Sequence, residues 1–333
     1  MVFLLSRLGI VPFLEERLNM TENHRDYEDG IAVIDAHHIR PGLAAIHLLV
    51  EGDKAAFIDT GTNLSVPGVL EVMRRNNLRP ENVAYVIVTH VHLDHAGGAG
   101  ELMRLFPEAM LVVHPRGARH MIDPSRLVAG SHAVYGEEQF RQSYGEIVPV
   151  PAERVIEAPH EFTLELNGRR LLFLDTPGHA RHHFCIFDER SGGVFTGDTF
   201  GISYREFDVD GREFIFPTTT PVQFEPDAAH DSIDLIMSLH PRAAYLTHYG
   251  RVTQLPRLAD KLHRMLDDFV NITEGVRDAG AMRHQRLVEG LGRYLLECLD
   301  AHGCRLAPDE ARALLENDIE LNAQGLEVWM DKA

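Results

Sequence analysis

The chain of 333 residues has little cysteine and no long apolar run. Its three cysteines, Cys185, Cys298 and Cys304, are odd in number, and no two of them form a Cys-x-x-Cys pair. A disulfide framework needs paired cysteines and an oxidising compartment, so this content predicts a cytoplasmic protein. No segment approaches the roughly 18 to 20 consecutive apolar residues of a membrane span, which predicts no membrane partner.

Basic residues are also scarce. Lysine and arginine number 32 against 50 acidic residues, which gives a formal net charge of −18. Binding to nucleic acid requires a basic surface, because the phosphate backbone is a polyanion. The charge therefore excludes nucleic acid as the expected partner and leaves a small molecule as the expected substrate.

The first residues do not form a convincing export signal. Residues 1–5 are apolar, but Arg7 interrupts the run, no basic segment precedes it, and residues 15–17 are charged. We interpret residues 1–29 as an N-terminal extension. Within it, residues 1–19 are either a short amphipathic helix or an extension ahead of a start at Met20.

Histidine, in contrast, is abundant, with twenty in the chain. Residues 89–95 read Thr-His-Val-His-Leu-Asp-His and directly follow the apolar run 85–88. Imidazole and carboxylate are preferred ligands of zinc and similar divalent metals. His90, His92, Asp94 and His95 are too many ligands for one tetrahedral ion that must also hold substrate, so the motif favours two metals over a histidine-rich surface turn.

Three further residues lie just past apolar runs downstream. His179 follows a strand-like segment that ends in a Pro-Gly turn, Asp198 follows a short apolar run and a glycine, and His248 follows residues 243–246. Each alone could be an ordinary turn residue. Their shared position at strand ends predicts that one sheet edge gathers them into the same cleft.

The order His-x-His-x-Asp-His, Pro-Gly-His, Gly-Asp and Thr-His resembles the metallo-β-lactamase superfamily, and the resemblance covers roughly residues 30 to 255. The upstream Ile-Asp-Thr-Gly at 58–61 is similar to the first motif of that superfamily. The sequences of these motifs are most similar to those of the glyoxalase II branch, whose members are thioesterases. They are similar also to those of an uncharacterised group that shares segments 122–125 and 144–147.

The resemblance implies a set of metal ligands and a further carboxylate that orients one of them. One metal is bound by His90, His92 and His179, the other by Asp94, His95 and His248, and both by Asp198 as a bridge. The expected ions are two Zn²⁺, although the same ligands accept iron or manganese. Asp59 is implied to orient a ligand histidine, and it could equally close its own Asp-Thr-Gly turn.

Strand and helix patterns alternate along residues 31–255, which predicts a four-layer α/β/β/α sandwich with the site at the sheet edge. Residues 255–270, 285–301 and 308–315 have helical spacing and define a helical C-terminal region, 256–333. This region could cover the cleft, form a homodimer interface or simply pack against the sandwich.

The predicted function is hydrolysis of an activated carbonyl in a small or medium substrate by metal-activated hydroxide, with a thioester first, a lactone or other ester second and a β-lactam last. Asp94 is the predicted catalytic residue that returns the proton. Tyr204 and Phe216, in the loop 200–226, are predicted to line the substrate pocket, and Tyr249 to stabilise an oxyanion.

Two alternatives remain at this point. The first is a persulfide dioxygenase, which has the same fold and uses one iron, here bound by His90 or His92 with His179 and Asp198. The second is a binding protein that has lost turnover. All seven ligand positions are intact, which argues against the second alternative.

Overall fold

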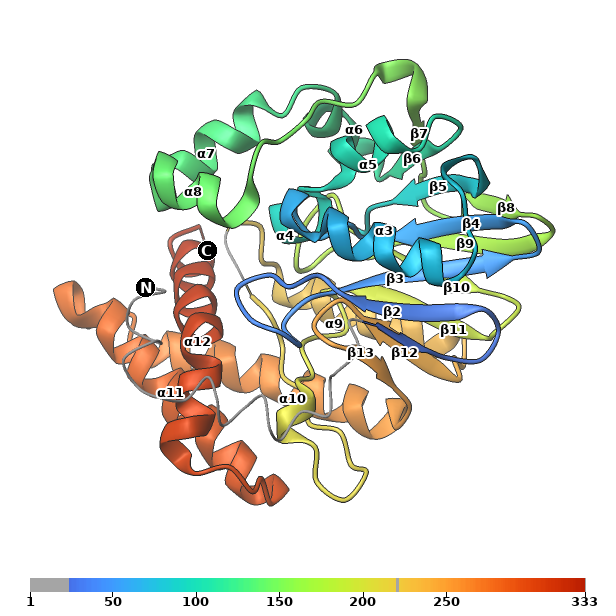
Figure 1. Ribbon diagram of the computed structural model, residues 1–333. Helices are drawn as coiled ribbons and strands as arrows, with labels where there is room; N and C mark the ends of the chain where they lie inside the picture. Colours follow the sequence, from blue (N-terminus) through green and yellow to red (C-terminus); the bar gives the residue numbers. More distant parts are fainter. Residues whose placement is uncertain (1–23, 220–221, 333) are drawn as a thin grey trace.

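Two β-sheets pack face to face, and helices cover the outer face of each (Figure 1). The computed structural model describes residues 24–219 and 222–332, so the predictions for residues 1–19 lie outside the described residues. The predicted four-layer α/β/β/α sandwich with a helical C-terminal region is confirmed. Among the described residues, no helix is both long enough and apolar enough to cross a membrane.

The first sheet has seven strands in the order of the sequence. They are β1 (His24–Asp26), β2 (Ile31–Asp35), β3 (Ala45–Glu51), β4 (Lys54–Ile58), β5 (Val83–Ile87), β6 (Met110–Val113) and β7 (Val155–Glu157). Neighbours from β1 to β4 are antiparallel, and those from β4 to β7 are parallel. We predicted that the sheet starts after residue 30, but it starts earlier, at β1. The prediction missed this strand because its residues are all polar and give no apolar strand pattern.

The second sheet has six strands in the order β13-β12-β11-β10-β9-β8. They are β8 (Thr163–Leu166), β9 (Arg169–Asp175), β10 (Phe184–Asp188), β11 (Gly193–Gly197), β12 (Ala243–Leu246) and β13 (Gly250–Val252). Only β11 and β12 are parallel neighbours. Their carboxyl ends therefore lie at one edge, from which Asp198 and His248 continue.

Figure 1 shows helices along both outer sides of the sandwich and further helices at one end of it. Over the first sheet lie α3 (Val66–Arg75), α5 (Ala99–Leu105) and α6 (Pro115–Ile122), and beside the second lie α9 (Pro226–Ser238) and α10 (Leu255–Glu274). The remaining helices are α4 (Leu93–Ala96), α7 (Ser125–Tyr135), α8 (Glu137–Tyr144), α11 (Arg283–His302) and α12 (Pro308–Met330). In Figure 1, α8 and the end of α12 lie at the same end of the sandwich.

Alternation along each strand divides the core into layers. In β4, Ala56 and Ile58 point into the apolar layer between the sheets, while Phe57 points to the helices and stacks on Phe106 with ring centroids 5.6 Å apart. The strands are thus buried on both faces, which explains their nearly continuous apolar sequences.

A histidine lies within the layer between the sheets. The ring of His47, in β3, packs edge-on against Phe195 and Tyr245, with centroids 5.3 and 5.9 Å away, and its Nε2 has no hydrogen-bond partner among the described residues. Burial lowers the pKa of His47 to about 4. The neutral ring therefore favours folding above pH 6.5, and this contribution is lost as the pH falls towards 4.

We expect His47→Phe to reduce the acid sensitivity of the protein. When the pH falls from 7.5 to 5, His47 lowers the unfolding free energy of the wild type by about 2 kcal/mol, because the ring takes up a proton more readily in the unfolded chain. The variant avoids this loss, because phenylalanine has no proton to take up. Denaturant unfolding at the two pH values measures this. The control is His240→Gln at an exposed position, which keeps the wild-type pH dependence. An equal change in unfolding free energy between the two pH values for His47→Phe and wild type would contradict the expectation.

Candidate metal centre

The first motif occupies the turn between β5 and α4. β5 ends at Ile87, and the chain passes through His90 and His92 before α4 begins at Leu93. His90 and His95 are fully buried. The turn separates the four motif side chains into two groups, which face different partners from the second sheet.

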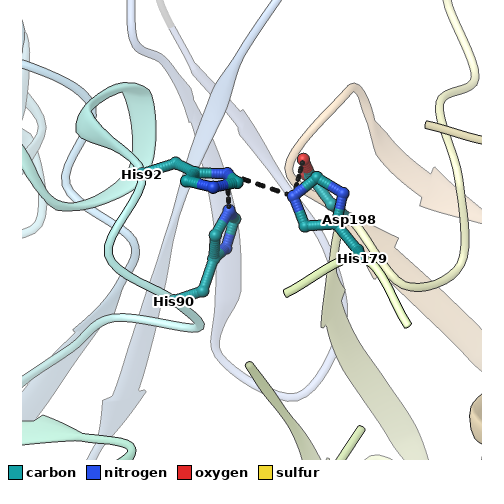
Figure 2. Close-up of side chains that lie close together, drawn as sticks. All are labelled: His90, His92, His179 and Asp198. Atoms are coloured by element: carbon teal, nitrogen blue, oxygen red, sulfur yellow. Dashed lines mark hydrogen bonds and ion pairs between the residues drawn. The ribbon is translucent and has the colours of Figure 1, made fainter. Parts of the chain in front are cut away.

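The first group contains His90, His92, His179 and Asp198, whose ligand atoms all lie within 4.8 Å of one another. Figure 2 shows the three imidazole rings around one point, with the ring of His92 joined by dashed lines to each of the other two. Its Nδ1 is 2.8 Å from Nε2 of His90 and 3.1 Å from Nε2 of His179. Several imidazole nitrogens that face one point form a site of the kind that binds a divalent transition metal.

The second group contains Asp94, His95 and His248. Nε2 of His95 is 3.5 Å and Nε2 of His248 is 3.4 Å from Oδ2 of Asp94. These residues come from α4 and from the segment after β12, so both sheets contribute to this group as they do to the first.

Asp198 lies between the two groups. Its Oδ2 is 3.3 Å from Nε2 of His179, while its Oδ1 is 3.3 Å from Nε2 of His95 and 3.6 Å from Nε2 of His248. Oδ1 of Asp198 and Nε2 of His95 are both buried, and neither has a hydrogen-bond partner among the described residues. Buried polar atoms without partners are costly, so the residues present fit a pair of cations that these atoms would ligate.

The backbone at Gly197 permits this position of Asp198. Gly197 ends β11 with a φ of +49°, and a Cβ there would lie 2.5 Å from Nε2 of His183 and 2.7 Å from Oγ1 of Thr89. A larger residue would displace the two segments that hold the motifs. The glycine of the Gly-Asp motif is therefore required by the close approach of its neighbours.

Acceptors behind the centre fix the orientation of three ligand rings. Nδ1 of His95 is 2.8 Å from Oδ2 of Asp59, Nδ1 of His248 is 2.7 Å from the carbonyl of Leu43, and Nδ1 of His179 is 3.4 Å from the carbonyl of Thr218. Since these oxygens only accept, each Nδ1 carries the hydrogen. In the neutral form of each ring, Nε2 therefore keeps a lone pair that faces the centre.

Asp59 connects the two sheets to His95. Its buried carboxylate accepts hydrogen bonds from the backbone N–H of Thr89 at 2.8 Å, the hydroxyl of Thr89 at 2.9 Å and the hydroxyl of Thr247 at 2.6 Å. None of the carboxylate's hydrogen bonds to described residues goes to the Asp-Thr-Gly turn itself. Of the two interpretations that the sequence left open, the contacts favour orientation of His95.

The charge distribution favours the metal-binding form at some candidate ligands and not at others. Burial opposes protonation of His95 and His248, but Asp198 and Asp94 outweigh it and raise the pKa of both rings, so each ring would lose a proton when a metal binds. Burial opposes ionisation of Asp198, but His95, His248 and His179 outweigh it and hold the pKa of Asp198 well below its usual range. Burial, together with His95 and His92, holds the pKa of His90 well below its usual range. An ionised carboxylate beside a neutral imidazole is the state that metal binding requires.

The three predicted substrate residues lie away from open space at the centre. Tyr204 and Phe216 are completely buried, and the Tyr204 hydroxyl donates to the carboxylate of Asp318 at 3.1 Å. Neither ring can contact a substrate without movement of its neighbours. Tyr249 follows ligand His248 but is also buried, and burial together with Asp35 raises the pKa of its hydroxyl.

The loop 200–226 reaches the centre through other residues. A small cavity of about 10 Å³, close to the space of one water molecule, adjoins His179 and Asp198. Its remaining walls are Thr199, which follows Asp198; Pro217 and Thr218 from this loop; Ala229 and Ile233 from α9; and Leu262 and Leu266 from α10. Pro217 and Thr218 thus bring this loop beside the centre, whereas Tyr204 and Phe216 do not line this cavity.

His183 is a supporting residue that the sequence did not identify. Its Nε2 accepts the backbone N–H of Asp198 at 3.2 Å, and its Nδ1 lies 2.9 Å from the hydroxyl of Thr176 and 3.1 Å from that of Thr199. It therefore positions the backbone of the carboxylate between the groups. The only signal was its place four residues after His179, at the start of an apolar strand.

Helix α12 also supports the loop that leaves Asp198. Oδ1 of Asn322 accepts the backbone N–H of Thr219 at 2.6 Å and its hydroxyl at 2.8 Å, and Asp318 contacts Tyr204 as described. Burial raises the pKa of Asp318 to about 6. The helical C-terminal region is thus joined to the centre by buried polar contacts.

Comparison with known proteins agrees with this geometry. The family model described as the metallo-beta-lactamase superfamily matches residues 39–248. The metallo-beta-lactamase fold-containing protein ST1585 of Sulfurisphaera tokodaii is 25% identical over 68% of this chain and 80% of its own length. An atrochrysone carboxyl ACP thioesterase of Aspergillus fumigatus is 30% identical, but the match covers 35% of this chain and only 27% of the thioesterase.

Solved structures show the same fold. The crystal structure of ST1585 superposes with a TM-score of 0.62 at 22% identity and covers 90% of this chain and 98% of that one. The metallo-beta-lactamase family protein TTHA1429 of Thermus thermophilus superposes with a TM-score of 0.65 at 18% identity, over 91% and 93% of the two chains. Together with the match over residues 39–248, these findings establish that the chain belongs to the metallo-β-lactamase superfamily.

Proposed function

We propose that the protein is a binuclear metallohydrolase that cleaves an activated carbonyl, with a thioester as the first substrate class. The observation that carries the proposal is Asp198, whose two oxygens face two separate ligand groups. Two bound divalent ions would polarise the carbonyl and ionise a water molecule near neutral pH. Zinc is the proposed metal, since histidine and aspartate in this combination suit it.

The chain itself supplies the proton acceptor. Burial opposes ionisation of Asp94, but His95 and His248 hold its pKa well below the usual range. Its side chain is 26% exposed, against 6% for Asp198, so it lies on the accessible side of the centre. Because an ionised carboxylate has no proton to give, we propose that Asp94 first accepts a proton and then returns it to the leaving group.

One resemblance supports a thioester over a β-lactam. The Aspergillus fumigatus relative is a thioesterase, whereas a relative from Bacillus subtilis, 25% identical over 51% of this chain, is described as a probable metallo-hydrolase and supports hydrolysis in general. A thiolate leaves without prior protonation more readily than an alkoxide or an amine, since its pKa is much lower. A centre whose one accessible carboxylate starts ionised therefore suits a thioester best.

The test is hydrolysis of matched substrates by the purified protein after its metal content has been measured. We expect kcat/KM for an acyl thioester to exceed that for the corresponding oxygen ester or lactone by about tenfold or more, with little cleavage of a β-lactam. A preference for the lactone would overturn the thioester assignment. One iron per chain with thiol-dependent oxygen uptake would replace the hydrolase by the dioxygenase alternative.

A further inference from the structure

Helices α9 and α10 bring a second group of histidines and aspartates together, separate from the metal centre. Each helix carries a histidine and, one turn later, an aspartate: His230 and Asp234 on α9, His263 and Asp267 on α10. Each histidine contacts the aspartate of the other helix. Nε2 of His230 is 3.3 Å from Asp267, and Nε2 of His263 is 3.2 Å from Asp234.

The two rings meet at their other nitrogens. Nδ1 of His230 lies 2.6 Å from Nδ1 of His263, the ring planes are parallel within 3°, and the centroids are 4.9 Å apart. Rings stacked face to face could not bring two nitrogens this close, so they face each other edge to edge. A carboxylate only accepts, so each aspartate favours a hydrogen on the Nε2 that it contacts. Both Nδ1 lone pairs then face one point.

Two facing lone pairs repel unless a cation lies between them, either a proton that the two rings share in an N–H···N hydrogen bond or a metal ion. The same feature marks the metal centre, where the ring nitrogens of His90, His92 and His179 approach to 2.8 and 3.1 Å. We propose that His230 and His263 bind a divalent transition-metal ion through Nδ1, with Asp267 and Asp234 orienting the rings from behind. Both histidines are about a quarter exposed, at 26% and 27%, so the rings can separate to ligand distance and water can complete the coordination.

The position of this pair connects it to the cavity beside the centre. His230 follows Ala229 and His263 follows Leu262, and both of these neighbours line the cavity at His179 and Asp198. An ion that joins the two histidines would fix α9 against α10. It would therefore stabilise the wall of the cavity without contact with the metal centre.

The test is Ni²⁺ and Zn²⁺ binding by the full chain, measured as ions per chain after equilibrium dialysis, together with the melting temperature. Compared with the double variant His230→Ala, His263→Ala, we expect the wild type to bind one additional ion and to show a rise in melting temperature with Ni²⁺ that the variant lacks. The matched control is His284→Ala, which removes a surface histidine that also contacts two carboxylates, Glu320 and Glu327, but has no second imidazole beside it among the described residues.

Equal ion counts and equal thermal shifts in wild type and double variant would overturn the proposal. It would also be overturned if His284→Ala lost the additional ion and the thermal shift to the same extent as the double variant. If the double variant does not fold, Asp234→Asn with Asp267→Asn provides the test. We expect it to weaken binding of the additional ion by about tenfold or more, because both rings lose the partner that orients them. Unchanged affinity in that variant would also overturn the proposal.

Discussion

Replacing Asp198 with alanine is expected to remove at least one metal ion per chain and to reduce kcat/KM to the limit of detection. The carboxylate approaches His179 with one oxygen and His95 and His248 with the other, so alanine deprives both ligand groups of a shared anion. Two dications would keep their mutual repulsion without the charge that offsets it. Metal analysis of the dialysed protein and steady-state kinetics on the best thioester measure the two effects.

The control for this variant is Asp198→Asn. Asparagine keeps the backbone N–H that donates to His183 and retains one carbonyl oxygen, so the fold is preserved while the negative charge is lost. We expect it to bind metal more weakly than wild type and to have little activity. Full activity with two ions bound in the alanine variant would mean that the ligand assignment is wrong.

Replacing Asp59 with asparagine is expected to weaken metal binding by about 10- to 100-fold, although Asp59 lies outside both ligand groups. The carboxylate is buried and surrounded by donors from Thr89, Thr247 and His95. An amide has one oxygen and turns two N–H donors towards groups that also donate. The ring of His95 loses its fixed orientation, and the mismatch lowers the free energy of unfolding by about 1 to 3 kcal/mol.

Asp35→Asn separates the two effects. Asp35, at the end of β2, is also buried and also accepts hydrogen bonds, from the backbone N–H groups of His37 and Gly42, both at 2.7 Å. It contacts no residue of the ligand groups through these bonds. We expect a comparable loss of unfolding free energy with unchanged metal affinity, measured by competition with a chelator. A similar loss of affinity in both variants would show that general destabilisation, and not the orientation of His95, is responsible.

The candidate ligand residues could be predicted from the sequence because each follows a strand. His90, His179, Asp198 and His248 lie within five residues of the ends of β5, β9, β11 and β12, and the sandwich brings these ends to one edge. The apolar runs before them identified the strands, and the residue types identified the chemistry. Local patterns were therefore sufficient for the position of the centre.

The supporting residues could not be predicted in this way, because their roles depend on contacts between distant segments. His183 acquires its role from the backbone of Asp198, and Asp318 and Asn322 from the loop 200–226. The two buried polar residues also interrupt the apolar pattern of α12, so the helical spacing seen in the sequence stops at residue 315, although the helix continues to Met330. In a helix that packs through polar contacts, apolar periodicity gives the wrong end.

Anomalous X-ray diffraction at the metal absorption edge, from crystals of the metal-loaded protein, tests the central claim most directly. We predict two peaks at the centre: one bound by His90, His92 and His179, the other by Asp94, His95 and His248, with Asp198 in contact with both. A single peak within the first group, with the second group free of metal, would contradict a binuclear centre.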